Sequence, residues 1–224
     1  MKRFFSIILC LLLIASLAAC ADEKATESPA TDNTKATVIP STPENTEENS
    51  PLFGEYYGNS YNNTLLNIGI SFPTDWILTP TKEIAKMNGI DEQEMLKDFE
   101  TFMKDKELGY ILQATDPTGV SKVNLTLENL ALSGNSNITG TQYIELFKDS
   151  IKETLMDSGA ANIILTPTSV QLGGRTYTVL TRSYMVDKMP FYQEQILFPL
   201  GNYMGILTLT GDTETILSRT YTLE

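Results

Sequence analysis

The chain contains 224 residues, with 28 acidic and 16 basic side chains and a formal net charge of −12. This acidic balance argues against nucleic acid as a partner, because binding to phosphates needs a basic surface. The sequence contains no histidine. That absence removes the commonest general base and the serine–histidine and cysteine–histidine pairs of hydrolases.

Residues 1–19 have the three parts of a secretory signal peptide, namely two basic residues, an apolar run and small residues before a cleavage site. The apolar run is short for a membrane-spanning helix, which needs about 20 residues. Leu17, Ala18, Ala19 and Cys20 resemble the lipobox of bacterial lipoproteins. The resemblance implies that the Cys20 thiol carries a lipid and that Cys20 becomes the mature N-terminus. An ordinary signal peptide with a chance cysteine is the alternative.

A lipid on Cys20 predicts where the protein resides. We expect it to be anchored to the outer face of the bacterial cytoplasmic membrane, or to an outer membrane if the organism has one. The other cysteine, Cys10, lies within the signal peptide. No disulfide is therefore expected in the mature chain.

Residues 20–52 combine the lipidated cysteine with a polar segment rich in Thr, Ser, Glu, Asn, Pro and Ala, without any aromatic residue. Such a composition buries too little apolar surface to offset the entropy of ordering. We therefore predict a disordered tether, which its prolines stiffen toward extended conformations.

Residues 53–224 are predicted to form a single domain that opens with a strand at 67–72 and two helices. Thr79 is predicted to cap the first helix, with Pro80 in its first position and Gly89 near its end. The second helix is predicted to begin at Asp91. Its apolar face consists of Met95, Phe99, Phe102 and Met103.

Two strands, 108–115 and 120–129, are predicted to flank a type I turn at 116–119. In the second strand, apolar residues alternate with Asn124, Thr126 and Glu128. This alternation predicts one buried and one solvent-exposed face. A long amphipathic helix follows, ended by Gly159, and its apolar residues are Ile144, Phe147, Ile151 and Leu155.

Four strands with short connections, 162–172, 175–186, 190–200 and 203–211, predict an antiparallel meander, and 213–220 is a candidate for a terminal helix. Separate blocks of helices and strands indicate an α+β fold. We predict an antiparallel sheet of about six to seven strands covered by helices.

Residues 61–76, YNNTLLNIGISFPTDW, resemble the opening of PsbP/Mog1-like domains, which occur in secreted and lipid-anchored bacterial proteins. The resemblance implies an α/β/α sandwich, in which helices cover both faces of an antiparallel sheet. Members of that family have unrelated roles, so the resemblance implies no catalytic residue.

The sequence shows no recognisable catalytic motif, and we predict no catalytic residue, no cofactor and no metal site. Glu194 lies in a strand between Gln193 and Gln195, and an exposed sheet face is the preferred interpretation over a catalytic carboxylate. A possible binding surface is the polar and aromatic cluster at the start of the domain, which suits contact with sugars or protein. An edge strand explains the same composition. The cluster consists of Tyr56, Tyr57, Tyr61 and Asn62.

These observations favour a non-enzymatic, lipid-anchored extracytoplasmic module that binds or assists another component of the bacterial envelope. The expected partners are the membrane, through the anchor, and an envelope protein or cell-wall component. Two alternatives stay open: a carrier of a metal or small ligand at the membrane surface, and a carboxylate-based glycan hydrolase.

Overall fold

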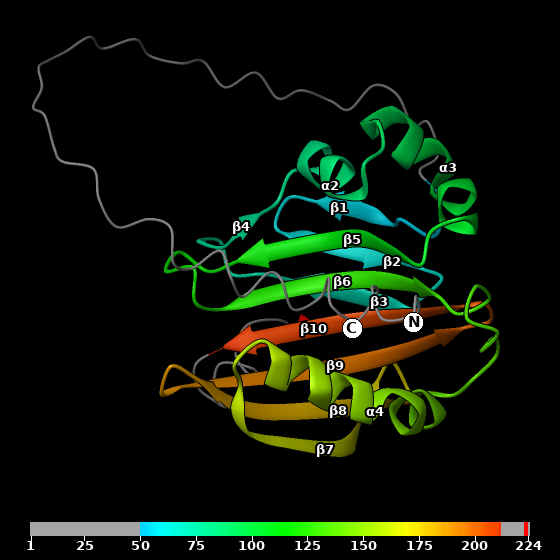
Figure 1. Cartoon of the computed structure of the whole chain (residues 1–224). Helices are drawn as coiled ribbons and strands as arrows, with labels where there is room; N and C mark the ends of the chain where they lie inside the picture. The colour runs from blue at the N-terminus through cyan, green and yellow to red at the C-terminus, as the bar shows by residue number, and fades with distance from the viewer. Residues whose placement is uncertain (1–49, 212–221, 224) are drawn as a thin grey trace, which may run out of the picture.

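The computed structural model describes residues 50–211 and 222–223. Within these residues the chain forms two antiparallel sheets and three helices (Figure 1). The large sheet contains β4 (Ile77–Leu78), β5 (Leu108–Thr115), β6 (Lys122–Asn129), β7 (Ala161–Leu172), β8 (Arg175–Val186), β9 (Met189–Leu200) and β10 (Tyr203–Gly211). Their order across the sheet is β4-β5-β6-β10-β9-β8-β7.

The small sheet lies behind β5 and β6 in Figure 1. It contains β1 (Glu55–Tyr57), β2 (Ser60–Asn63), β3 (Ile68–Ser71) and β11 (Thr222–Leu223), in the order β1-β2-β3-β11. Neighbouring strands in this sheet are antiparallel. Residues far apart in the sequence therefore meet at β3, which pairs with β2 on one side and with β11 on the other.

The helices are α2 (Thr81–Asn88), α3 (Glu92–Lys104) and α4 (Gly140–Asp157). Helix α3 begins as predicted, because the Asp91 side chain caps it by accepting from the Gln93 amide. The prediction that Thr79 caps α2 is wrong by one residue. Pro80 occupies the N-cap position, and the Thr79 amide donates to the carbonyl of Gln113 in β5, 2.8 Å away.

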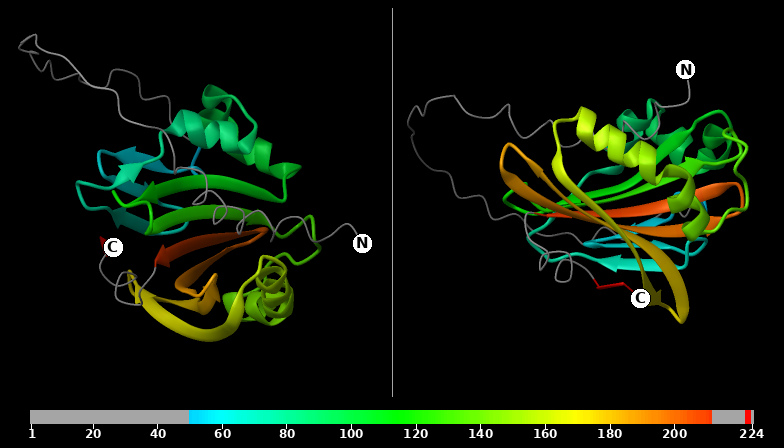
Figure 2. Two further views of the ribbon diagram at one scale, coloured as in Figure 1. Left: turned by 60° about the vertical axis from the view of Figure 1, so that its left-hand side comes forward. Right: turned by 60° about the horizontal axis from the view of Figure 1, so that its bottom comes forward.

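The large sheet forms the middle layer of the domain (Figure 2). Helix α4 packs on one face against β7, β8 and β9, over a core that includes Leu180, Leu197 and Ile206. The small sheet, α2 and α3 enclose a larger core on the other face. The central side chains of that core include Tyr61, Ile70, Phe99, Leu112 and Leu125.

The predicted solvent-exposed face of β6 is in fact buried, so that expectation is wrong. Asn124, Thr126 and Glu128 are all at least nine-tenths buried. Strand β6 lies between β5 and β10 in the middle of the sheet, and Tyr143 of α4 donates to the Glu128 carboxylate, 2.5 Å away. Burial is the main cause that raises the pKa of Glu128.

The predicted α+β class and the antiparallel sheet are confirmed, including the C-terminal meander from β7 to β10. The large sheet has seven strands, within the predicted range, and the first three strands form with β11 a second, smaller sheet that the prediction did not include. The predicted signal peptide, lipobox, most of the tether, and the helix at 213–220 lie outside the described residues. No helix within the described ranges is both long and apolar enough to cross a membrane.

Candidate binding site on the small sheet

The small sheet has an inner face toward the core and an outer face toward solvent, and strand alternation assigns each side chain to one of them. In β2, Tyr61 is 1% exposed whereas Asn62 is exposed. In β3, Ile68 and Ile70 are buried, so Gly69 between them lies on the outer face. The cluster predicted from the sequence is therefore divided between the two faces.

Tyr56 and Tyr61 belong to the inner face, which corrects their prediction as parts of a binding surface. Their rings meet edge to face, with centroids 5.2 Å apart. The Tyr61 hydroxyl donates to the carbonyl of Phe53 at 2.7 Å and accepts from the Asn63 amide at 3.0 Å. The Tyr56 hydroxyl donates to the carbonyl of Ile111 at 2.5 Å. Burial raises the pKa of both phenols, so both rings are structural anchors.

Tyr57 and Asn62 remain on the outer face, where the sequence places a possible binding surface. Tyr57 is 61% exposed and lies opposite Ser60 in the ladder between β1 and β2. Its hydroxyl donates to the Glu55 carboxylate, and this hydrogen bond is the main cause that raises the pKa of Tyr57. Asn62 lies opposite Glu55 on one side and opposite Gly69 on the other.

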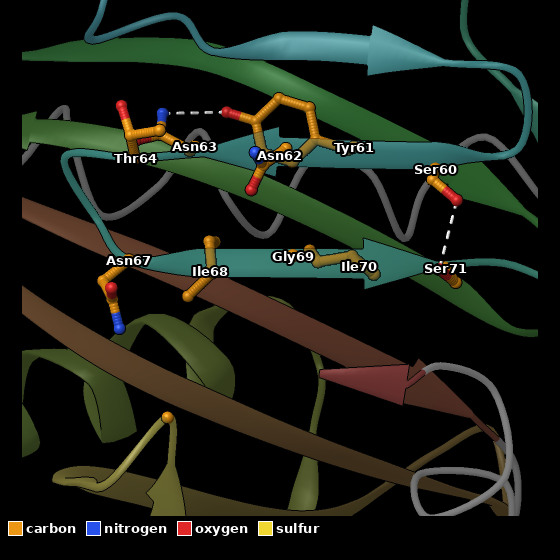
Figure 3. A pocket seen from close by; sticks show the side chains of 11 residues that line it. Ser60, Tyr61, Asn62, Asn63, Thr64, Asn67, Ile68, Gly69, Ile70 and Ser71 are labelled. Atoms are coloured by element: carbon orange, nitrogen blue, oxygen red, sulfur yellow. Dashed lines mark hydrogen bonds between the residues drawn. The ribbon is translucent and has the colours of Figure 1, made fainter. Parts of the chain in front are cut away.

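A pocket of about 530 Å³ opens on this part of the small sheet, along β2, β3 and the turn between them (Figure 3). The Ser60 and Ser71 hydroxyls form a hydrogen bond of 3.1 Å across the two strands. Gly173, in the turn between β7 and β8, also lines the pocket. A Cβ atom added to Gly173 would lie 3.0 Å from the side-chain nitrogen of Asn67, so this turn closely approaches the end of the pocket.

The pocket lining offers neutral hydrogen-bonding groups. Among the residues that the structure describes, it includes three amide side chains and three hydroxyl side chains besides Tyr61, and no carboxylate, lysine or arginine. These lining residues are Asn62, Asn63, Asn67, Ser60, Thr64 and Ser71. Asn63 is buried and bonded to Leu52 and Tyr61, whereas the other five side chains can donate to and accept from a polar ligand. The described lining residues include no base that could activate a serine or threonine hydroxyl.

Glu194 is placed apart from this pocket, on β9 of the large sheet. Its pKa is raised because burial disfavours the charged carboxylate. Its ladder neighbours are Thr181 on β8 and Leu209 on β10, so no second carboxylate lies directly across from it. A glycosidase of the usual type uses two carboxyl groups that flank the scissile bond, and the ladder positions beside Glu194 supply no second one.

The prediction of an exposed face around Glu194 is wrong for its two neighbours. Gln193 and Gln195 are both buried, because they point to the other face of the sheet and join a polar network there. The Gln193 amide donates to the Thr210 hydroxyl, and the Gln195 amide donates to the Thr208 hydroxyl, each at 3.1 Å. Arg182 donates to the Gln195 carbonyl. In the part of the chain that the structure covers, no group of three or more His, Cys, Asp or Glu side chains is placed to hold a metal ion.

Comparison with solved structures returns similar folds at low sequence identity. The chain is similar to cyanobacterial PsbP (CyanoP) from Synechocystis sp. PCC 6803, with 10% identity and a TM-score of 0.43 over 74% of this chain and 91% of that chain. It is also similar to LpqN of Mycobacterium tuberculosis, a protein involved in cell envelope biogenesis, with 13% identity and a TM-score of 0.37 over 70% of this chain and 82% of that chain.

A third similar structure comes from Bacteroides thetaiotaomicron VPI-5482, with 10% identity and a TM-score of 0.34 over 69% of this chain. This chain spans 41% of that structure's length. No family model and no curated protein matches the sequence.

Sequence reasoning missed Gly69, Asn67 and Gly173 as parts of the site. The alternation of Ile68, Gly69 and Ile70 carries a usable signal, because a glycine between two buried residues marks a strand position without a side chain on the outer face. No local pattern connects Gly173 with Asn67, because more than a hundred residues separate them in the chain.

Proposed function

We propose that the protein is a lipid-anchored extracytoplasmic binding module of the bacterial envelope, which holds an envelope protein or cell-wall component through the outer face of its small sheet. The observation that carries this proposal is the pocket along β2 and β3, with its neutral amide and hydroxyl lining. Such a lining recognises polar groups, whereas hydrolysis needs an activated nucleophile or a positioned acid and base.

The anchored location is supported by the sequence from Leu17 to Cys20, which resembles a lipobox. Two acyl chains bind a membrane far more firmly than a single chain does. The tether that follows, up to residue 52, would let the domain reach partners at a distance from the membrane. Stretched out fully, its residues after Cys20 span roughly 100 Å.

An accessory role without catalysis is supported by the chemistry of the described acidic residues. Glu194 has no carboxylate directly across from it in the ladder, and Glu128 is buried beneath the Tyr143 hydroxyl. The protein would act by bringing a partner to the membrane surface and holding it there.

Cell fractionation and cross-linking on intact cells test this proposal, with Cys20→Ala as the matched control. The wild-type protein is expected in the membrane fraction, cross-linked to a specific envelope component that mass spectrometry identifies. The Cys20→Ala variant is expected to leave the membrane fraction and to lose that component. Equal membrane association of the two forms would refute the anchor, and the absence of any enriched component would refute the binding role.

A further inference from the structure

We infer that the pocket on the small sheet binds an uncharged saccharide, with one sugar ring stacked on Tyr57 and its hydroxyl groups paired with Asn62 and the neighbouring polar side chains. This inference rests on the binding role proposed above and names the ligand class. Three features carry it: a pocket that Gly69 lines without a side chain, a neutral hydrogen-bonding lining among the described residues, and an exposed aromatic ring on the same face.

Gly69 lines the pocket and leaves β3 without a side chain at this position of the outer face. Gly69 lies opposite Asn62 in the ladder, and the buried Ile68 and Ile70 on either side point to the core. Gly69 is not among the glycines with a positive φ, so its backbone conformation does not demand glycine. A glycine inside a strand weakens the strand and often marks a place where a ligand approaches the backbone closely.

The lining matches the chemistry of sugar hydroxyls. An asparagine amide presents two donors and an acceptor in one plane, which suits a pair of adjacent hydroxyl groups on a sugar ring. Asn62, Thr64 and Asn67 are all exposed to solvent, and all three line the pocket. Ser60 and Ser71 bond to each other, and each hydroxyl oxygen keeps further capacity to accept.

The aromatic ring supplies the apolar contact that a sugar needs for its C–H face. Tyr57 is not itself a lining residue, but it lies opposite Ser60, which lines the pocket, and its ring is largely exposed. The hydrogen bond from its hydroxyl to Glu55 restrains the ring. An aromatic ring with a polar tip provides a large contact surface at a small cost in conformational entropy.

The charge on this face selects against acidic sugars. The described residues of the pocket lining are uncharged, and the carboxylate of Glu55 on β1 lies directly across from Asn62. An anionic saccharide would place like charges close together, which disfavours its binding. The expected ligand is therefore a neutral oligosaccharide rather than a uronate-containing one.

The test uses the full chain, purified from membranes in detergent, and two matched probes. One probe is the uncharged tetrasaccharide of N-acetylglucosamine, and the other is a hyaluronan tetrasaccharide, which carries glucuronate. Binding is measured by titration calorimetry for wild type, Gly69→Thr, Tyr57→Ala and Gln93→Ala. Threonine at position 69 adds a side chain to the pocket lining and favours the strand, so this variant should lose binding without unfolding. Gln93 is an exposed amide on α3 and serves as the control.

We expect wild type and Gln93→Ala to bind the neutral probe equally, and to bind the acidic probe more weakly. Gly69→Thr and Tyr57→Ala should each weaken binding at least about tenfold, with the melting temperature of Gly69→Thr kept or raised. Failure to bind the neutral probe, equal affinity for both probes, or undiminished binding by Gly69→Thr would overturn the saccharide inference. If cross-linking in cells instead captures a protein partner on the same face, the proposed binding function is retained and the saccharide is rejected as its ligand.

Discussion

Removing the hydroxyl group of Tyr61 or of Tyr57 tests whether the first belongs to the core and the second to the surface. Tyr61→Phe removes a hydroxyl that bridges the Phe53 carbonyl and the Asn63 amide inside the core. Tyr57→Phe removes a hydroxyl whose partner, the Glu55 carboxylate, is exposed. The two substitutions delete the same atom from neighbouring strands, so their difference isolates the effect of burial.

The magnitude follows from the contacts of each hydroxyl. Without the Tyr61 hydroxyl, the Phe53 carbonyl loses its partner in a place that water does not reach, and an unsatisfied buried group costs about 1–3 kcal/mol. The Asn63 amide retains its second bond, to the carbonyl of Leu52 at 3.1 Å. The expected loss is therefore about 1–3 kcal/mol of unfolding free energy, or roughly 3–9 °C in melting temperature for a domain of this size. Removing the exposed hydroxyl of Tyr57 should leave the melting temperature unchanged.

Thermal unfolding followed by circular dichroism measures both variants against wild type under one buffer condition. Urea titration gives the free energies independently. A Tyr61→Phe variant as stable as wild type would refute the structural role of that hydroxyl. A large loss for Tyr57→Phe would contradict its place on the outer face.

Three further substitutions test the packing of the layers, each by thermal unfolding. Gly140→Ala would place a Cβ atom 2.7 Å from that of Thr178, and the displacement of α4 should cost about 1–3 kcal/mol. Asn88→Ala removes an amide that bonds both the backbone nitrogen and oxygen of Tyr110 at 2.7 and 2.8 Å, at a cost of about 1–3 kcal/mol. Burial raises the pKa of Glu128, so wild type should gain stability as pH falls from neutral toward the ordinary pKa of a glutamate. The Glu128→Gln variant should not show that gain, so its stability relative to wild type should be highest at neutral pH. If the variant and wild type had the same dependence of stability on pH, the raised pKa of Glu128 would be contradicted.

Local patterns in the sequence predict two kinds of feature. One is a turn or cap whose bonding partners are close in the chain, and the other is a helix face marked by regularly spaced apolar residues. The spacing of Met95, Phe99 and Met103 predicts the apolar face of α3, and all three side chains are fully buried. The turn at 116–119 is confirmed by the bond from the Gly119 amide to the Asp116 carbonyl at 3.0 Å. Helix α4 ends just before Gly159, as predicted, and Thr139 and Gln142 form a capping box at its start, which the prediction did not include.

Features set by distant partners could not be predicted in this way. Alternation in β6 distinguishes apolar from polar side chains, but it does not show that Glu128 meets Tyr143 on a helix that follows later in the chain. Pattern also failed to separate Tyr61 from Asn62, because a four-residue strand is too short to show its period reliably. The pocket needs the β7–β8 turn at Gly173, which the sheet topology brings to β3.

The most direct test of the proposed binding surface is a photoreactive amino acid placed at single positions of the full-length protein in living cells. One position is Tyr57, and the control is Leu146, which is 53% exposed on α4 and lies across the large sheet from the pocket. The account predicts a specific envelope adduct on irradiation with the probe at position 57 and none with the probe at position 146. Adducts of equal yield at both positions, or an adduct at position 146 alone, would contradict it.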